Sequence, residues 1–434
     1  MRRLAVLALA GLLAGCAPAD DRPEIVVQRF FGECGAVYDG STEVTKADTE
    51  CGILTTLVNR FEAENPDVRV KVNIVAWPGY PQLAAQIAAG DPPDLVTMHQ
   101  SVIADYSSRG LIEPVEPLLA HARIDPASFT PAARAGVEKQ GRLYAMPWDT
   151  IGRLFHINTA LMAKAGLMRG GKPVLPNSPE ELLAQARQFR QRTGKPYLIQ
   201  AQVSAPDFMV AFLYTYLLAQ GKPIYPDPRH VRLDTPEARA VVSLMRQLTA
   251  EGLTTTNQDF PAATAAFTQG GGGIFPVGTW MLGPYDAEAA KPSSALHDHY
   301  AVAPFPRLWG SPAPFVDGHA WVVPAAQRSP AERAAMARFL AFLAKYNYDW
   351  SRTGQLPAFA AVLARPDFRA LRHRADIAAL SATGRMLPGY VERQGAVQGL
   401  IGEELEAAVT GTKPVEVALR DAERRVNQLY AQMM

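Results

Sequence analysis

The residues that could do chemistry do not form a known catalytic motif. The sequence contains no His-Glu-x-x-His, no phosphate loop ending in Lys-Ser/Thr, no Gly-x-Ser-x-Gly elbow and no Gly-x-Gly-x-x-Gly. The four glycines at 270–273 lack the lysine and spacing of a nucleotide loop, so we interpret them as a flexible turn. Carboxylates are plentiful, but sequence alone cannot place two of them across a cleft. The interpretation as an exported hydrolase therefore stays open, although no motif supports it.

One pair of histidines has the spacing of metal ligands. His297 and His299 flank Asp298 and would share one face of a strand. No third ligand is indicated nearby, whereas even catalytic zinc uses three protein ligands. We therefore interpret this segment as a solvated turn, and expect neither a metal nor a cofactor.

The N-terminus has the profile of an export signal. Arg2 and Arg3 precede an apolar run over 4–13, which is shorter than the about 20 residues that span a bilayer. Residues 13–16, Leu-Ala-Gly-Cys, resemble a bacterial lipobox, in which the cysteine is lipidated and becomes the first mature residue. Residues 1–23 are thus expected to be signal and tether, with Cys16 as the membrane anchor. The alternative is an ordinary cleaved signal with an incidental cysteine.

Two cysteines remain, Cys34 and Cys51, in a chain expected to leave the cytoplasm. An even number in an oxidising compartment favours a disulfide. Metal binding is less favoured, because no second ligand pair at zinc-like spacing accompanies them.

Composition limits the partners. The 434 residues allow two or three domains, and 48% hydrophobic with 20% charged residues is ordinary for a folded chain. The 43 basic and 42 acidic residues leave a net charge of +1. No overall field therefore exists to gather nucleic acid, and none is expected as a partner.

The first hundred residues alternate between strands and helices. Residues 24–30 contain a β-branched run that predicts a buried strand. Apolar spacings of three and four over 53–61 predict a helix, which Asn65-Pro66 ends. Strands over 68–74 and 94–98, with a helix over 80–89 between them, complete a β-α-β-α-β order. This order is typical of a doubly wound sheet, whose ligand sites lie beyond the carboxyl ends of the strands.

Two serines mark the beginnings of later helices. Ser178 and Ser329 each precede a proline and a capping-box glutamate, which predicts helices beginning at 179 and 330. Helical periodicity also covers 417–432. No repeat or linker divides the chain, so we expect interleaved domains with several crossings.

Eight short segments stand in an order known from one family. They are 61–66, 88–96, 110–114, 141–149, 155–158, 277–280, 300–306 and 350–357. In this order, behind a lipobox, they resemble the extracellular solute-binding proteins of ABC importers, family 1, the type that includes sugar-binding members. The resemblance covers nearly the whole mature chain.

The family fold implies an α/β protein of the two-lobed periplasmic-binding-protein type II, with doubly wound sheets joined by hinge segments. Carried onto this chain, lobe 1 comprises 24–148 and 301–349, and lobe 2 comprises 149–300 and 350–434. Crossings are expected near 146–150, 300–303 and 350–357. The resemblance also implies a monomer at the cell envelope, in the periplasm or on the outer face of the cytoplasmic membrane, that delivers its ligand to an ABC permease.

A sugar ligand needs flat aromatic rings for its apolar faces and fixed polar groups for its hydroxyls. Residues of both kinds occur where the resemblance places the cleft. The candidate ligand-binding residues are Glu33, Trp77, Tyr80, His99, Gln100, Trp148, Asp149, Trp280, Asp317, His319, Trp350, Arg352 and Gln355. We further expect Trp280 and Trp350 to lie on the lobe 2 side and present ring faces to the sugar. Each tryptophan could instead belong to a core.

Three functions compete. The favoured one is a non-catalytic, lipid-anchored receptor for a neutral sugar. A sugar phosphate would need several cleft arginines, and only Arg352 is obviously placed. An exported carbohydrate-active enzyme and a receptor for another polar solute are the alternatives. Two departures from the family, the Cys34–Cys51 insertion and the four glycines, leave the specificity open.

Overall fold

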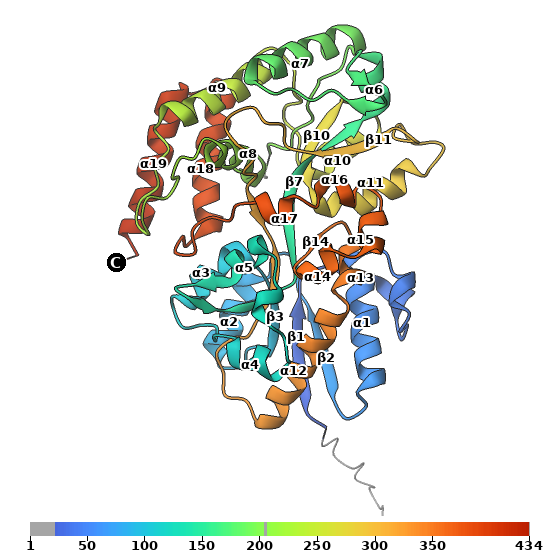
Figure 1. Ribbon diagram of the computed structural model, residues 1–434. Helices are drawn as coiled ribbons and strands as arrows, with labels where there is room; N and C mark the ends of the chain where they lie inside the picture. Colours follow the sequence, from blue (N-terminus) through green and yellow to red (C-terminus); the bar gives the residue numbers. More distant parts are fainter. Residues whose placement is uncertain (1–21, 204–205, 434) are drawn as a thin grey trace, which may run out of the picture.

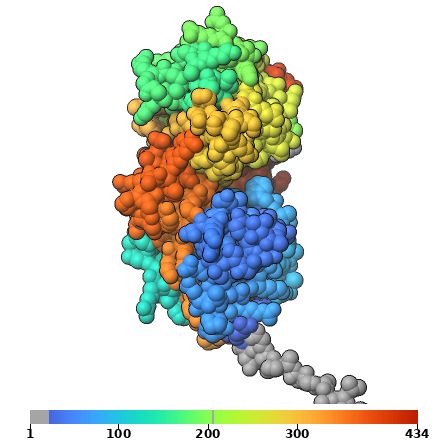
Figure 2. Space-filling model, turned by 90° about the vertical axis from the view of Figure 1, so that its right-hand side faces the viewer, coloured from blue at the N-terminus to red at the C-terminus, as the bar shows by residue number. Residues whose placement is uncertain are grey.

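The computed structural model describes residues 22–203 and 206–433, and Cys16 lies outside them. The chain forms two lobes, each with its own β-sheet and helices (Figure 1). One hydrophobic core fills lobe 1, and two adjoining clusters fill lobe 2. Figure 2 shows the lobes stacked end to end, with orange segments of the C-terminal third on one side of their junction. No helix within these described residues is long and apolar enough to cross a membrane.

The sheet of lobe 1 confirms the predicted β-α-β-α-β order. Its strand order is β2-β1-β3-β13-β6, and β1 pairs in parallel with both β2 and β3. The later strand β13 lies antiparallel between β3 and β6. The bounds are β1 Glu24–Arg29, β2 Arg69–Ile74, β3 Leu95–His99, β6 Ala145–Pro147 and β13 His319–Val322.

Helices cover both faces of this sheet, and each packs the apolar side of the helix against the strands. In α1 the buried side chains recur three and four apart, and the Thr49 hydroxyl accepts from the N–H of Gly52 at the helix start. The predicted capping box at Ser329 is complete, with Glu332 bonding back to it. The bounds are α1 Glu50–Glu64, α2 Tyr80–Ala89, α3 Ile103–Ser107, α4 Glu116–His121, α5 Pro131–Val137, α12 Pro330–Lys345, α13 Asn347–Ser351 and α14 Ala360–Leu363. Four 3-10 turns and a small hairpin complete lobe 1: η1 Gly35–Tyr38, η2 Val44–Lys46, η3 Gln100–Val102, η4 Pro126–Ser128, β4 Glu138–Lys139 and β5 Arg142–Leu143.

The sheet of lobe 2 is built around one long strand, β7 (Asp149–Asn158). Strands β10 (Ile274–Gly278) and β11 (Tyr300–Pro304) pair antiparallel on its two sides. The helices are α6 Thr159–Lys164, α7 Pro179–Thr193, α8 Pro206–Ala219, α9 Pro236–Ala250, α10 Phe260–Thr268, α11 Leu282–Ala289, α15 Pro366–Ala370, α16 Arg374–Ile377, α17 Leu380–Thr383, α18 Gln394–Val409 and α19 Val415–Ala431. The remaining elements are η5 Thr279–Met281 and the hairpin β8 Met168–Arg169 with β9 Lys172–Pro173.

Two segments near the crossings between the lobes pair with the start of β7. Its first two residues pair with β14 (Leu356–Pro357), and the next two pair with β12 (Val316–Asp317). The expected crossing at 300–303 is wrong, because β11 stays in the lobe 2 sheet, paired along β7. The return to lobe 1 comes between β12 and β13 instead, so 301–316 belongs to lobe 2. Within the expected lobe 2 segment, Trp350 and Phe359 belong to the lobe 1 core, whereas Leu356 belongs to a lobe 2 cluster.

The predicted disulfide between Cys34 and Cys51 is present and joins the loop after β1 to the first turn of α1. The loop that it closes is held from its other side by Arg352. The Arg352 guanidinium donates to the carbonyls of Val44, Thr45 and Ala47. The structure thus places the Arg352 side chain against the loop, and its role as a ligand residue stays a prediction.

Candidate functional site

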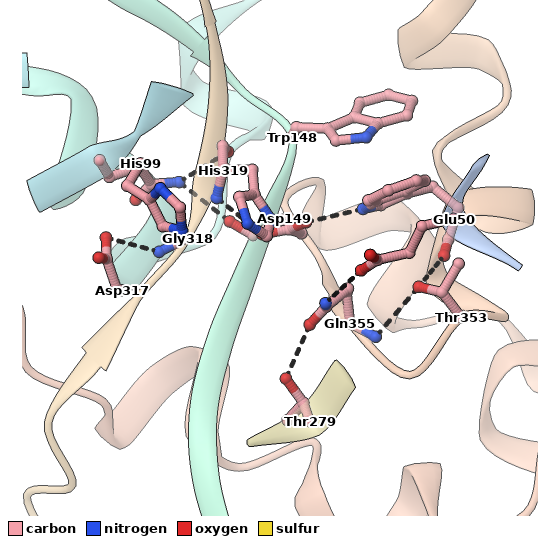
Figure 3. Close-up of polar contacts among 12 residues, drawn as sticks. Glu50, His99, Trp148, Asp149, Thr279, Asp317, Gly318, His319, Thr353 and Gln355 are labelled. Atoms are coloured by element: carbon pink, nitrogen blue, oxygen red, sulfur yellow. Dashed lines mark hydrogen bonds and ion pairs between the residues drawn. The ribbon is translucent and has the colours of Figure 1, made fainter. Parts of the chain in front are cut away.

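Asp149 stands at the junction of the lobes, where β6 leads into β7. Its carboxylate accepts from the backbone N–H of His319 and from His319 Nδ1, both at 2.8 Å, and from Trp350 Nε1 at 2.7 Å (Figure 3). Burial alone would lower the pKa of His319, but the adjacent Asp149 carboxylate raises it above its ordinary value. The pair therefore binds a proton more tightly than a free histidine would.

Gln100 ties the same junction together from the end of β3. Its side-chain N–H donates to the carbonyls of Asp149 at 2.9 Å and His319 at 3.1 Å. The backbones approach so closely here that a Cβ on Gly318 would lie 2.3 Å from the Asp149 carbonyl. Gln100, Asp149, His319 and Trp350 are called the floor below.

A second hydrogen-bonded chain joins the lobes beside the floor. The Thr279 hydroxyl of lobe 2 donates to Gln355, and the Gln355 amide donates to Glu50 of α1, both at 2.8 Å (Figure 3). Burial raises the pKa of Glu50 above its ordinary value, against the opposing effect of His319. Gln355 therefore lies at the site as predicted, but its side chain is hydrogen-bonded to Thr279 and Glu50 of the protein itself.

Aromatic rings gather at the carboxyl ends of the lobe 1 strands. The His99 ring stacks on Phe30 at 5.1 Å, and Trp77 meets His99 edge-on at 5.9 Å. Phe31 meets His319 at 4.9 Å, which connects these rings to the floor. Trp77 is 69% exposed. Phe30, Phe31, Trp77, Tyr80 and His99 are called the lobe 1 wall.

Asp317 lies beside this wall on β12. Its carboxylate accepts from the N–H of Ser101 at 3.0 Å, from the Ser101 hydroxyl at 2.6 Å and from the N–H of Gly318 at 2.8 Å. It also acts on the pKa of both His99 and His319. Asp317 is half-buried, so it remains reachable as a hydrogen-bond acceptor.

Lobe 2 faces the site with a cation between two rings. The Arg153 guanidinium lies 4.3 Å from the ring centre of Phe208 and 4.8 Å from that of Trp280. It also pairs with Asp207 at 2.5 Å. Asp207 in turn acts on the pKa of His99 across the junction. Arg153, Asp207, Phe208 and Trp280 are called the lobe 2 wall, and a small cavity lined by Arg153, Gln200 and Phe208 opens next to it.

The structure separates the sequence-predicted residues into two groups. Trp77, Tyr80, His99, Asp317 and Trp280 lie on walls or beside them, and Glu33 is exposed in the disulfide loop.

The second group is buried. Trp148 and Trp350 are fully buried, with ring centres 5.4 Å apart in the lobe 1 core. The expectation that Trp350 lies on the lobe 2 side and offers a ring face is therefore wrong, because its rings pack on Trp148 and Phe31. Gln100, Asp149 and His319 of the floor are also buried, and so is Gln355 beside the floor.

Sequence reasoning missed Glu50, Phe30, Phe31, Arg153, Asp207 and Phe208. Glu50 had one available indication, its place next to Cys51 and shortly before the helix predicted over 53–61. The others lie where only the packing of lobe 2 against lobe 1 decides their exposure.

The expected turn at His297–His299 holds no metal site. Across the described part of the chain, no group of three His, Cys, Asp or Glu side chains could hold a metal ion.

The chain belongs to the bacterial extracellular solute-binding proteins. Residues 49–346 match the model of that family. Among curated relatives, a protein of Brucella abortus (strain 2308) that is named as a binding protein is 25% identical over 311 residues, 68% of each chain.

Solved structures share the two-lobed fold. The sugar-binding protein MalE of Xanthomonas citri has a TM-score of 0.78 at 17% identity, covering 94% of this chain and 98% of that one. Maltose-bound MalE3 of T. maritima has a TM-score of 0.75 at 20% identity, covering 94% and 99%. The acarbose receptor GacH of Streptomyces glaucescens has a TM-score of 0.76 at 18% identity, with the same coverage.

Proposed function

We propose that the protein binds a carbohydrate between the lobe 1 and lobe 2 walls. The observation that carries this proposal is Trp77, whose indole is 69% exposed beside a cluster of polar groups. An exposed indole offers a flat apolar surface to a ligand, and a sugar has the weakly apolar face that such a ring fits. His99, Asp317 and the Arg153–Asp207 pair supply donors and acceptors around it.

The charges favour a neutral sugar. Arg153 is already paired with Asp207, and Arg352 is occupied by carbonyls of the disulfide loop. Glu33 and Asp317 form no salt bridge with any residue in the described part of the chain, which disfavours an anionic ligand. The solved structures named above are described with maltose, acarbose or sugar as ligand, which agrees with this proposal.

The family match and the lipobox-like residues 13–16 support the remaining steps of the proposal. The lobes close around the sugar by bending at the β7, β12 and β14 crossings, and the loaded monomer delivers it to an ABC permease. Cys16 carries the lipid that holds the protein at the membrane. The protein returns its ligand unchanged and is not an enzyme.

A thermal-shift screen of mono- and oligosaccharides tests the ligand class, because binding stabilises by RT ln(1 + [L]/Kd). A sugar that raises the melting temperature is then titrated by calorimetry and recovered for analysis. Recovery of the unchanged sugar supports a receptor. Hydrolysed sugar, or no response from any carbohydrate, overturns the proposal.

Variants at the lobe 1 wall locate the site. Trp77→Ala is expected to weaken binding by about 1 to 4 kcal/mol, as loss of an aromatic anchor does. Trp77→Phe keeps a ring and should retain most of the affinity. Val37→Ala is the matched control, since Val37 is 78% exposed on the disulfide loop and is expected to leave binding unchanged.

The anchor is tested separately by Cys16→Ser. The variant should appear in the soluble fraction with unaltered sugar affinity. Retention in the membrane fraction would contradict lipidation at Cys16.

A further inference from the structure

The partners of His99 identify which of its ring nitrogens carries the hydrogen. The backbone N–H of His99 donates to the Tyr80 hydroxyl oxygen at 3.0 Å, and the same hydroxyl lies 2.6 Å from Nδ1. A tyrosine hydroxyl has one hydrogen to donate. When Nδ1 accepts that hydrogen, both contacts are complete hydrogen bonds. The ring hydrogen of neutral His99 is then on Nε2.

The other tautomer leaves a hydrogen without an acceptor. With a hydrogen on Nδ1, the Tyr80 oxygen would accept twice and its own hydrogen would need a third partner. None is present for this hydroxyl within 22–203 and 206–433. A desolvated donor without an acceptor destabilises the structure. Burial also raises the pKa of Tyr80 well above its ordinary value, so the hydroxyl keeps its hydrogen.

The imidazole is neutral and its plane is fixed. Burial and the neighbouring His319 lower the pKa of His99 to about 4. The ring lies parallel to Phe30, with 4° between the planes, and perpendicular to Trp77. His99 is half-buried, and its Nε2 has no hydrogen-bond partner among the residues that the structure describes. A single, oriented N–H is left without an acceptor next to the exposed indole.

We propose that the Nε2–H of His99 donates a hydrogen bond to an oxygen of the bound ligand and so helps to set specificity. This inference rests on the proposed carbohydrate site. The ligand must present an acceptor, a hydroxyl or ring oxygen, at the point where its face covers Trp77. Tyr80 is the positioning residue, because the hydrogen bond from its hydroxyl to Nδ1 of His99 keeps the ring hydrogen on Nε2. A site with a fixed donor discriminates strongly against analogues that lack the matching oxygen.

Long-range ¹⁵N–¹H NMR of the histidine-labelled protein tests the tautomer without a ligand. His99 is expected to show a protonated Nε2 and an unprotonated Nδ1 at pH 7. In Tyr80→Phe the preference should weaken or reverse. A protonated Nδ1 in the wild type would overturn the inference.

Two substitutions of different reach test the donor in binding. The amide nitrogen of glutamine reaches about as far as Nε2, whereas that of asparagine reaches only as far as Nδ1. For the sugar found in the screen, His99→Asn should weaken affinity roughly tenfold to hundredfold, and His99→Gln less than about threefold. Melting curves of both variants confirm that the comparison is between folded proteins.

The outcomes separate the two proposals. If the wild type binds a sugar and His99→Asn binds it equally well, the donor role of His99 is wrong and the carbohydrate site stands. If the wild type binds no carbohydrate, the proposed function fails and the donor role fails with it. A removed hydroxyl that weakens binding to the wild type but not to His99→Asn would identify the oxygen that accepts the hydrogen bond.

Discussion

Two tryptophans show how the floor of the site differs from its lobe 1 wall. Trp350 is fully buried, donates its indole N–H to Asp149 and packs against Trp148. Trp77 is 69% exposed in the loop before α2, with its edge against His99. Both residues stand near the junction of the lobes. The polar groups and the indole of the floor are paired within the protein at the junction of the lobes. In the lobe 1 wall, the Trp77 ring and the Nε2–H of His99 are still available to a ligand.

Substitutions in the floor are expected to change the free energy of unfolding most. Trp350→Ala should lower the free energy of unfolding by about 3 to 5 kcal/mol, because it leaves a cavity in the lobe 1 core and removes a donor from Asp149. Urea unfolding followed by circular dichroism measures this. Trp350→Phe, which loses the N–H but keeps a ring, should cost less. An unfolding free energy unchanged in Trp350→Ala would show that the floor is not what holds the junction.

The disulfide loop comes next. Cys34→Ser combined with Cys51→Ser should destabilise the protein by about 3 kcal/mol, since the unfolded chain regains the entropy of a short open loop. Reduction of the wild type under native conditions should give a similar loss. A double variant as stable as the wild type would mean that the hydrogen bonds from Arg352 and Asn59 to loop carbonyls hold the loop without the disulfide.

Buried histidines should make stability depend on pH with opposite signs. Burial lowers the pKa of His156 to about 3, with its ring nitrogens bonded to Tyr300 and the Gly278 carbonyl. Below about pH 6.5, His156 therefore binds a proton in the unfolded chain but stays neutral in the folded protein. His156 should cost about 1.4 kcal/mol per pH unit between pH 6 and 4.

His319 works in the other direction. Its folded pKa is raised, so its contribution is fully present below about pH 6.5 and is lost as the pH rises through the folded pKa. The difference between the unfolding free energies at pH 7 and pH 5 should be smaller in His156→Gln than in the wild type. A pH slope that the substitution leaves unchanged would contradict the role of His156.

The smallest expected change in stability is at the wall. Trp77→Ala should alter the free energy of unfolding by less than about 0.5 kcal/mol, because the side chain is already exposed. The same urea experiment applies. A loss as large as that of Trp350→Ala would remove the distinction between floor and wall.

Much of lobe 1 follows from the sequence. The alternation of strands and helices up to β3, the cap at Ser329 and the Cys34–Cys51 disulfide depend on local spacing and on a pair of cysteines, and all are confirmed. The return to lobe 1 was placed too early. An apolar strand such as Tyr300–Pro304 looks the same in either sheet, and only its pairing along β7 assigns it.

The site could be predicted less well than the fold. Trp77 and Trp350 are chemically equivalent in sequence, and their exposure depends on whether neighbours such as Trp148 and Phe31 fill the space around them. Arg352 carried the expected charge, but its carbonyl partners belong to an insertion whose path the sequence does not reveal. Arg153 lies on a strand with no distinguishing motif, and its role depends on Asp207 and Trp280 from distant segments.

The position of β13 also sets the order of events during synthesis. This strand lies between β3 and β6, yet residues 149–318 are made after β6 and before it. At the usual speed of translation these residues take roughly ten to thirty seconds. Throughout that interval β3 and β6 lack their shared partner, so lobe 1 cannot complete its sheet while most of lobe 2 is being made. The newly made chain therefore has a long period with open strand edges, during which a chaperone that binds unfolded protein would protect it from aggregation.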